Sequence, residues 1–275
     1  MWGIIGGSGF EKFDGFTVVE NLSVETPFGL ASSGFKKVRI NEHECLFVSR
    51  HGEHHEKLPS EVNYRANIFA LKKYGAKALM SFSAVGSLKK IHKPGDMVVP
   101  YQYIDRTKGV RAHTFCGNGI VGHVSLAKPV CVNLAEKVRE ISQSKSWDCH
   151  FGQTYVCVEG PYFSTKAESH HYREMGADII GMTHFPEYAL AREVGLLYLP
   201  CCFITDYDCW DDSIPHVTLE EVIQVMRFNN AKAFELTQDI LSHGDDLYVG
   251  CECSEQGLKT GLMSKTDVPW LDVLL

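Results

Sequence analysis

Small, hydroxyl-bearing turns follow several apolar runs of the sequence. They read Gly6-Gly7-Ser8-Gly9, Ser83-Ala84-Val85-Gly86-Ser87 and Gly181-Met182-Thr183. Backbone N–H groups and hydroxyls in such turns can surround an anion, although any one of them is equally typical of an ordinary strand-to-loop turn. Arg50, followed by His51 after another apolar run, adds a forked donor that suits phosphate. Together these residues predict a cage for one tetrahedral oxyanion, with Arg50 as its only cation.

Two acids follow the most apolar run, Leu196–Thr205, in the order Asp206-Tyr207-Asp208. A carboxylate at such a place can accept a hydrogen bond from a ligand N–H or hold a shared proton. It can also simply cap a turn. Phe163, after Gly160-Pro161, could stack on a flat ring or pack as a core aromatic residue. The pair of acids at the end of a deeply apolar strand favours a functional role.

Metal binding is weakly indicated. His51 and His55 are four residues apart, with His54 between them and His113 further on, but Gly52 and Pro59 argue against a helix there. No His-Glu-x-x-His or Cys-x-x-Cys occurs, so we expect no metal site.

The ten cysteines are scattered, often in apolar runs, which is typical of reduced core thiols in the cytoplasm.

Composition excludes several classes of protein. The chain has 275 residues, 44% hydrophobic and 22% charged, which indicates one folded globular domain. Its net charge is −7 and it has no basic run, so we expect no nucleic-acid partner. There is no apolar run of transmembrane length and no signal-peptide pattern at the start, so we expect a cytoplasmic protein without membrane contact.

Alternating strands and helices are predicted to position these residues, in a parallel or mixed sheet covered by helices on both faces. Ligands of such sheets bind at the carboxyl ends of the strands, where the turns above lie. The predicted strands are Trp2–Gly6, Glu44–Ser49, Lys77–Phe82, Gly95–Pro100, Gly152–Val158, Asp178–Gly181 and Leu196–Thr205. The predicted helices are Asn63–Tyr74, Val132–Gln143, Lys166–Met175, Pro186–Val194 and Thr218–Leu241, the last with a Thr218–Glu221 capping box.

Eight motifs in order resemble the methylthioadenosine phosphorylase branch of the trimeric purine nucleoside phosphorylase family. They are GIIGGSG, SRHGEHHEKLPSEVNYRANIFALK, FSAVGSL, IDRT, GHVSLAKP, EGPYFSTKAES, IIGMTHFPEYALARE and TDYDCW, and they cover roughly Trp2 to Leu241. The resemblance implies an α/β fold with a mixed, partly barrel-like central sheet surrounded by helices. It also implies a homotrimer or hexamer and no cofactor beyond inorganic phosphate as co-substrate. The tail 251–275 matches less well.

Site residues carried over from the resemblance fall into three groups. Phosphate binding falls to Ser8, Arg50, His51, Ser83, Ala84 and Thr183. Nucleoside binding falls to Phe163 on the purine, Met182 beneath the ribose, and Asp206 with Asp208 at the purine edge. The 5′-pocket falls to Leu219 and Val222, with His123 reaching in from the neighbouring subunit.

The implied activity is that of a pentosyltransferase of purine and methionine salvage, which splits 5′-methylthioadenosine into adenine and 5-methylthioribose 1-phosphate. Phosphate would attack C1′ while Asp206, protonated or sharing a proton with Asp208, donates to N7. A carboxylate accepts a hydrogen bond from the 6-amino group of a purine, but it repels the oxygen of a 6-oxo group. The two acids therefore favour adenine as the base.

Three alternatives stay open. Tyr162 and His184 replace the family's usual residues, so a phosphorylase of methylthioinosine or inosine is the close rival. A metal-dependent hydrolase built on the histidines and a non-catalytic nucleoside-binding protein are more remote. Cys251-Glu252-Cys253 resembles the Cys-x-Cys end of some archaeal members, where the pair forms a disulfide; here we expect it to stay reduced.

Overall fold

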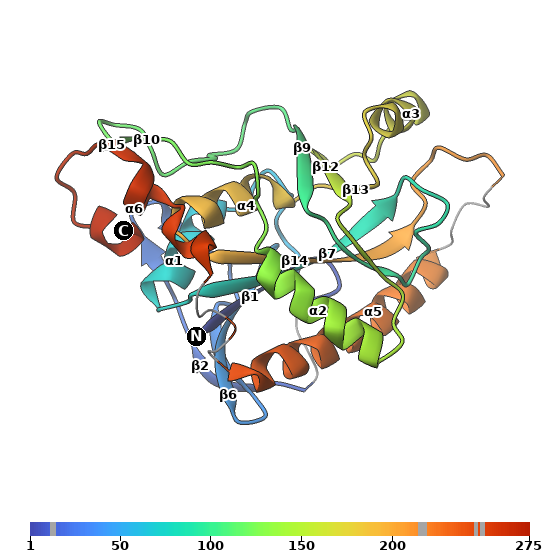
Figure 1. The fold of residues 1–275 in the computed structure, drawn as a ribbon, viewed down its shortest axis with the longest axis horizontal. Coiled ribbons are helices and arrows are strands. Elements are labelled where there is room, and N and C mark those ends of the chain that lie inside the picture. Colours follow the sequence, from blue (N-terminus) through green and yellow to red (C-terminus); the bar gives the residue numbers. More distant parts are fainter. Residues whose placement is uncertain (12–14, 214–218, 245–246, 248–250) are drawn as a thin grey trace.

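The computed structural model describes residues 1–11, 15–213, 219–244, 247 and 251–275, with the backbone only for residues 219–223. The predicted alternation of strands and helices is confirmed (Figure 1). The strands are β1 (Trp2–Gly6), β2 (Thr17–Asn21), β3 (Glu25–Thr26), β4 (Gly29–Leu30), β5 (Lys36–Ile40), β6 (His43–Ser49), β7 (Ala78–Ser87), β8 (Met97–Val99), β9 (Gln102–Arg106), β10 (Val121–Gly122), β11 (Cys149–Phe151), β12 (Thr154–Val158), β13 (Ile179–Gly181), β14 (Leu197–Asp206) and β15 (Leu262–Ser264). The helices are α1 (Tyr64–Lys73), α2 (Val132–Ser144), α3 (Lys166–Glu174), α4 (His184–Glu193), α5 (Leu219–Ser242), the 3-10 helix η2 (Glu252–Glu255), α6 (Leu258–Gly261) and α7 (Leu271–Leu274).

The central sheet is mixed and branches at β7. Its main path runs β11-β8-β14-β7-β1-β6-β5-β2, while β13 pairs with the far end of β7 and continues into β12 and β9. The stretch Ser83–Ser87, interpreted from the sequence as a turn, instead continues β7 to ten residues. The reason is that Gly86 and Ser87 pair with β13, which gives their backbone groups partners. The branch brings the end of β13 beside the ends of β1, β7 and β14.

Alternation along the central strands separates two cores. Successive side chains of a strand point to opposite faces of the sheet. One face carries Ile4, Met80 and Leu199 and packs against α2 and α5. The neighbouring residues Ile5 and Leu79 point to the other face. That other core contains α1 and α4. Helices therefore cover both faces of the sheet, as predicted (Figure 1).

Two helix starts carry side-chain caps that fix the loops before them. Asn63 caps α1 by accepting from the Ala66 N–H, and Thr165 forms a capping box with Glu168 at the start of α3. The predicted capping box at Thr218 lies outside the described residues. Among the described helices, none is long and apolar enough to cross a membrane.

Candidate active site

A cavity of about 450 Å³ opens where the carboxyl ends of β1, β6, β7, β13 and β14 meet. Most of the residues predicted to form the site line it together: Ser8, Arg50, His51, Ser83, Ala84, Phe163, Met182, Thr183, Asp206 and Asp208. These side chains are up to about 200 residues apart in the sequence, so the converging strand ends of the mixed sheet have gathered them.

Arg50 is fully buried at the closed end of this cavity and is held by Glu187 of α4. Its Nε donates to Glu187 Oε2 at 2.8 Å and its Nη2 to Oε1 at 3.1 Å, while Nη1 donates to the Phe82 carbonyl at 3.0 Å. Burial lowers the pKa of Arg50, but the charge and hydrogen bonds of Glu187 outweigh it and hold that pKa above its ordinary value. Arg50 is thus half of a buried ion pair, so it offers the cavity oriented N–H donors more than net charge.

Glu187 is itself surrounded by donors. Tyr198 donates to its Oε1 at 2.9 Å, and Ser81 donates to the same oxygen. Gly7 leaves room for the guanidinium, since a Cβ there would lie 2.3 Å from Arg50 Nη1. The glycine that the sequence indicated as a phosphate turn therefore also has a packing reason.

His51 is a neutral ring. Burial, with the nearby charge of Arg50, lowers the pKa of His51 to about 4. Its Nδ1 lies 2.9 Å from the Lys57 carbonyl, which only accepts, so Nδ1 carries the proton and Nε2 is an acceptor. His51 lines the cavity, where such an acceptor fits the hydroxyl of a monohydrogen phosphate.

Ser83 is linked to a second buried histidine. Its Oγ lies 2.8 Å from His184 Nε2, and His184 Nδ1 lies 3.1 Å from the Tyr103 hydroxyl. Burial, followed by the charge of Arg50, lowers the pKa of His184 well below its ordinary value. In the tautomer with Nε2–H, His184 donates to Ser83 and accepts from Tyr103, while the Ser83 hydroxyl donates to Cys202 Sγ at 3.6 Å.

Asp206 and Asp208 line the opposite end of the cavity in different states. Asp206 Oδ2 accepts from Thr205 Oγ1 at 2.7 Å and Oδ1 from the Asp208 N–H at 2.8 Å, so its carboxylate is well satisfied. Burial, with the nearby Asp206 charge adding to it, raises the pKa of Asp208. Asp208 Oδ2 is buried without a hydrogen-bond partner among the described residues. The carboxyl more suited to hold a proton is therefore Asp208.

The outer part of the cavity is open. Phe163 lines it but is 87% exposed, so in the single chain it packs against little. Met182 is half-buried, and its carbonyl accepts from Arg111 Nη1 at 2.7 Å. Apolar side chains of Leu58 and Met226 also reach this cavity.

The residues predicted for the 5′-pocket and the histidines considered as metal ligands are not shown to gather at this cavity. His123 is exposed after β10 and does not line the cavity. The side chains of Leu219 and Val222 lie outside the described residues. His51 and His55 stack at 4.6 Å, but with His54 and His113 they form no metal-binding group of three in the part of the chain that the structure describes.

The contacts of Glu187, His184 and Met226 were not predicted from the sequence. Glu187 did carry a signal, because an acid directly before the apolar helix run Tyr188–Leu190 is costly to bury without a partner. His184 was noted only as a departure from the family's usual residue and Met226 only as part of a helix, since only the fold shows what they face.

Comparisons with known proteins agree with this geometry. A family model described as the phosphorylase superfamily matches residues 2–242. An S-methyl-5′-thioadenosine phosphorylase from Geobacter sulfurreducens is 41% identical over 97% of this chain and 93% of its own. One from Thermofilum pendens is 45% identical over 87% of this chain and 90% of its own.

Solved structures give the same result. A methylthioadenosine phosphorylase from an Antarctic soil metagenomic library has a TM-score of 0.90 at 40% identity, covering 100% of this chain and 98% of its own. Methylthioadenosine phosphorylase from Schistosoma mansoni in complex with adenine has a TM-score of 0.85 at 34% identity, covering 92% and 96%. This chain belongs to the phosphorylase superfamily and, within it, to the methylthioadenosine phosphorylases.

Proposed function

We propose that this protein is a pentosyltransferase that cleaves 5′-methylthioadenosine with inorganic phosphate, giving adenine and 5-methylthioribose 1-phosphate. The observation that carries the proposal is one cavity with a buried donor cluster at one end and two carboxyl groups at the other. A nucleoside placed between them has C1′ near the anion and its base near the acids. The names of the relatives support this substrate, and a Schistosoma mansoni variant was solved with methylthioadenosine.

Phosphate would bind at the closed end, on the hydroxyls of Ser8, Ser83 and Thr183 and the free N–H of Arg50 Nη1. As the N-glycosidic bond stretches, positive charge grows on the ribosyl ring, and the adjacent phosphate stabilises it electrostatically before bonding to C1′. The ion pair with Glu187 holds Arg50 in place, so little reorganisation is needed during the reaction.

The leaving base takes up negative charge and needs a proton. Asp208, whose pKa is raised, can supply one, while a carboxyl oxygen of Asp206 accepts a hydrogen bond from the 6-amino group. From the sequence we expected Asp206 to be the donor, whereas the different environments of the two acids favour Asp208. The apolar residues Leu58 and Met226 suit a 5′-methylthio group.

The structure gives no support to the alternative of a 6-oxopurine nucleoside phosphorylase, which rested on Tyr162 and His184. Tyr162 is 80% exposed and, like His184, is not part of the cavity wall, so neither substitution reshapes the purine end directly. The metal-dependent hydrolase would need a ligand group at the cavity, and the described histidines form none.

Self-association as a trimer or hexamer and a cytoplasmic location complete the proposal. Exposed Phe163 and exposed His123 are the side chains that a neighbouring copy would cover. Light scattering coupled to size exclusion measures the assembly directly. A monomer at working concentration would contradict this part.

The test of the activity is adenine release from 5′-methylthioadenosine, followed by chromatography with and without phosphate. We expect release only with phosphate, with 5-methylthioribose 1-phosphate as the second product. Adenosine, methylthioinosine and inosine are measured in parallel. Faster turnover of the inosine series contradicts the adenine preference, and release without phosphate contradicts phosphorolysis itself.

A further inference from the structure

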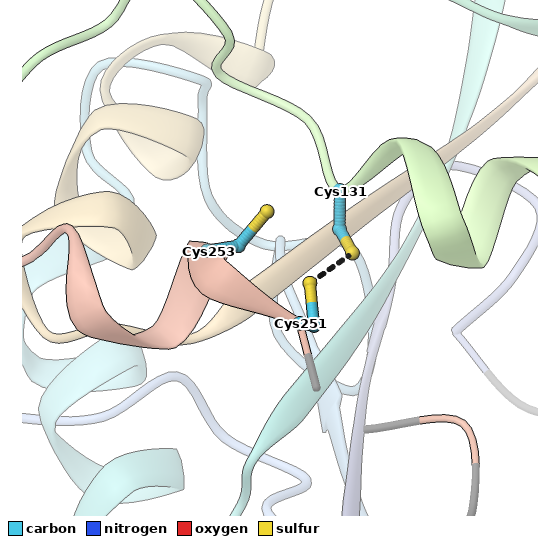
Figure 2. Close-up of side chains that lie close together, drawn as sticks. All are labelled: Cys131, Cys251 and Cys253. Atoms are coloured by element: carbon cyan, nitrogen blue, oxygen red, sulfur yellow. Dashed lines mark hydrogen bonds between the residues drawn. The ribbon is translucent and has the colours of Figure 1, made fainter. Parts of the chain in front are cut away.

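Three cysteines that are distant in the sequence converge away from the active cavity. Cys131 immediately precedes α2, and Cys251 and Cys253 belong to the C-terminal segment (Figure 2). The Sγ atoms of Cys131 and Cys251 are 3.3 Å apart, and all three Sγ atoms lie within 4.8 Å of one another. Cys131 and Cys251 are buried, and Cys253 is half-buried. None of the three lines the active cavity.

These distances suit a shared ion better than a disulfide. A disulfide holds its sulfur atoms at about 2.05 Å, and all ten cysteines here are unbridged. A zinc–sulfur bond of about 2.3 Å places the sulfur atoms of a tetrahedral or trigonal site about 3.8–4.0 Å apart. The observed separations of 3.3 Å and up to 4.8 Å lie on either side of that value. Side-chain adjustments of less than about 1 Å would form the site.

Charge around the cluster suits thiolates. Arg192 lies beside the Cys253 thiol and is only 3% exposed. It donates to the carbonyls of Cys253 and Lys128 and to Gln256, forms no ion pair with an acid among the described residues, and its buried Nε has no partner. A buried cation without an anion is costly, and an anionic metal–thiolate group would compensate it. Cys131, at the start of α2, adds the positive end of a helix.

We propose that Cys131, Cys251 and Cys253 together bind one thiophilic ion, Zn²⁺ or Cu⁺, each thiol losing its proton as its sulfur bonds to the metal. Soft thiolate ligands select these ions, and no carboxylate or imidazole of the described residues joins the group. The ion fastens the C-terminal segment to the start of α2. That segment also inserts Leu258, Leu271 and Leu274 into the core beside α1 and α4. In the sequence Cys251 and Cys253 stand out as a pair, but nothing connects them with Cys131, which is 120 residues from Cys251.

The experiment uses the full chain, reduced and freed of metal by a chelator under argon. Zn²⁺ is titrated in competition with a chromophoric chelator, and Cu⁺ is titrated separately in the same way. We expect one equivalent of one of these ions per chain, and the arm that saturates identifies it. Cys251→Ser and Cys253→Ser should lose stoichiometric binding. Cys116→Ser, a half-buried cysteine outside the cluster, is the control and should keep it.

A second measurement guards against variants that fail to fold. In the wild-type chain, the bound ion should slow alkylation of Cys131, Cys251 and Cys253 at least about tenfold, read by mass spectrometry, while Cys116 reacts at an unchanged rate. Substoichiometric binding of both ions overturns the proposal, as does equal binding by the cluster variants or equal alkylation rates with and without metal. A Cys131–Cys251 disulfide that persists in the reduced sample and blocks binding also overturns it.

Discussion

The two ends of the active cavity are built differently. At the end where we propose that phosphate binds, here called the phosphate end, Arg50 is fully buried, and Ser83 and Thr183 are only 3% and 6% exposed. At the base end, Phe163 is 87% exposed. A site that is rigid at one end and open at the other can hold the anion ready while the nucleoside enters. The phosphate end is therefore enclosed by this one chain, whereas the base end is open in the single chain.

The largest effect should come from breaking the support beneath the phosphate end. Glu187→Gln removes one charge of a pair whose side chains are each 1% exposed and leaves Arg50 uncompensated. Removing one partner of a buried pair costs about 3–5 kcal/mol, so we expect that loss in the free energy of unfolding and no measurable phosphorolysis. Urea denaturation and adenine release measure the two effects.

Glu53→Gln is the matched control. Glu53 pairs with Lys36 at the surface, with its side chain 47% exposed, and a surface pair contributes about 0–1 kcal/mol. Equal destabilisation by the two substitutions would contradict the difference between a buried support and a surface pair.

The next largest effect separates the two acids of the base end. We expect Asp208→Asn to lower kcat/KM for 5′-methylthioadenosine about 10²-fold, because the proton for the leaving base is lost. A raised pKa keeps Asp208 protonated to higher pH than an ordinary Asp, so the wild-type rate falls as pH rises through that value, above the ordinary 3.8. In Asp208→Asn this fall should disappear, as pH–rate profiles would show.

Two further variants test that assignment. Asp211→Asn, in the same loop but not lining the cavity, should keep the wild-type profile. If instead Asp206→Asn abolishes the fall with pH and Asp208→Asn preserves it, the proton belongs to Asp206, as the sequence analysis anticipated.

The residues that line the site could be predicted from the sequence, whereas the residues that support them from beneath could not. The ends of the apolar strands were recognisable because small residues, hydroxyls and acids follow them, and the mixed sheet then gathers Ser8, Thr183 and Asp206 in one place. Partners that lie beneath the site were not recognisable. The pairing of Arg50 with Glu187 spans 137 residues and depends on how α4 packs, which no local pattern specifies.

Some strands were not predicted at all, because their residues carry no local pattern. Short strands such as β2, with every residue exposed, have no hydrophobic alternation to reveal them. β9, half-exposed, was missed as well, and its pairing with β12 helps to build the branch of the sheet. The expectation of a partly barrel-like sheet came from the resemblance, whereas the structure shows a mixed sheet that branches at β7.

A smaller effect should come from the hydrogen bonds that orient Ser83. Ser83→Ala and His184→Phe should each raise KM for phosphate about 2–12-fold with a smaller change in kcat, since a typical hydrogen bond contributes about 0.5–1.5 kcal/mol. Because His184 acts through Ser83, the double variant should be no worse than the worse single one. Tyr103→Phe should have a weaker effect. Additive losses would contradict this positioning role.

The smallest effect is expected at the open end. Phe163→Ala should raise KM for the nucleoside a few-fold, because ring stacking contributes about 0.5–1.5 kcal/mol, and should leave KM for phosphate unchanged. Tyr162→Ala is a close control, since its neighbouring ring is 80% exposed but does not line the cavity; it should change neither constant. Steady-state kinetics with each substrate varied in turn measure both. A rise in phosphate KM in Phe163→Ala would show that the two ends are coupled, whereas the contrast in burial predicts that they act independently.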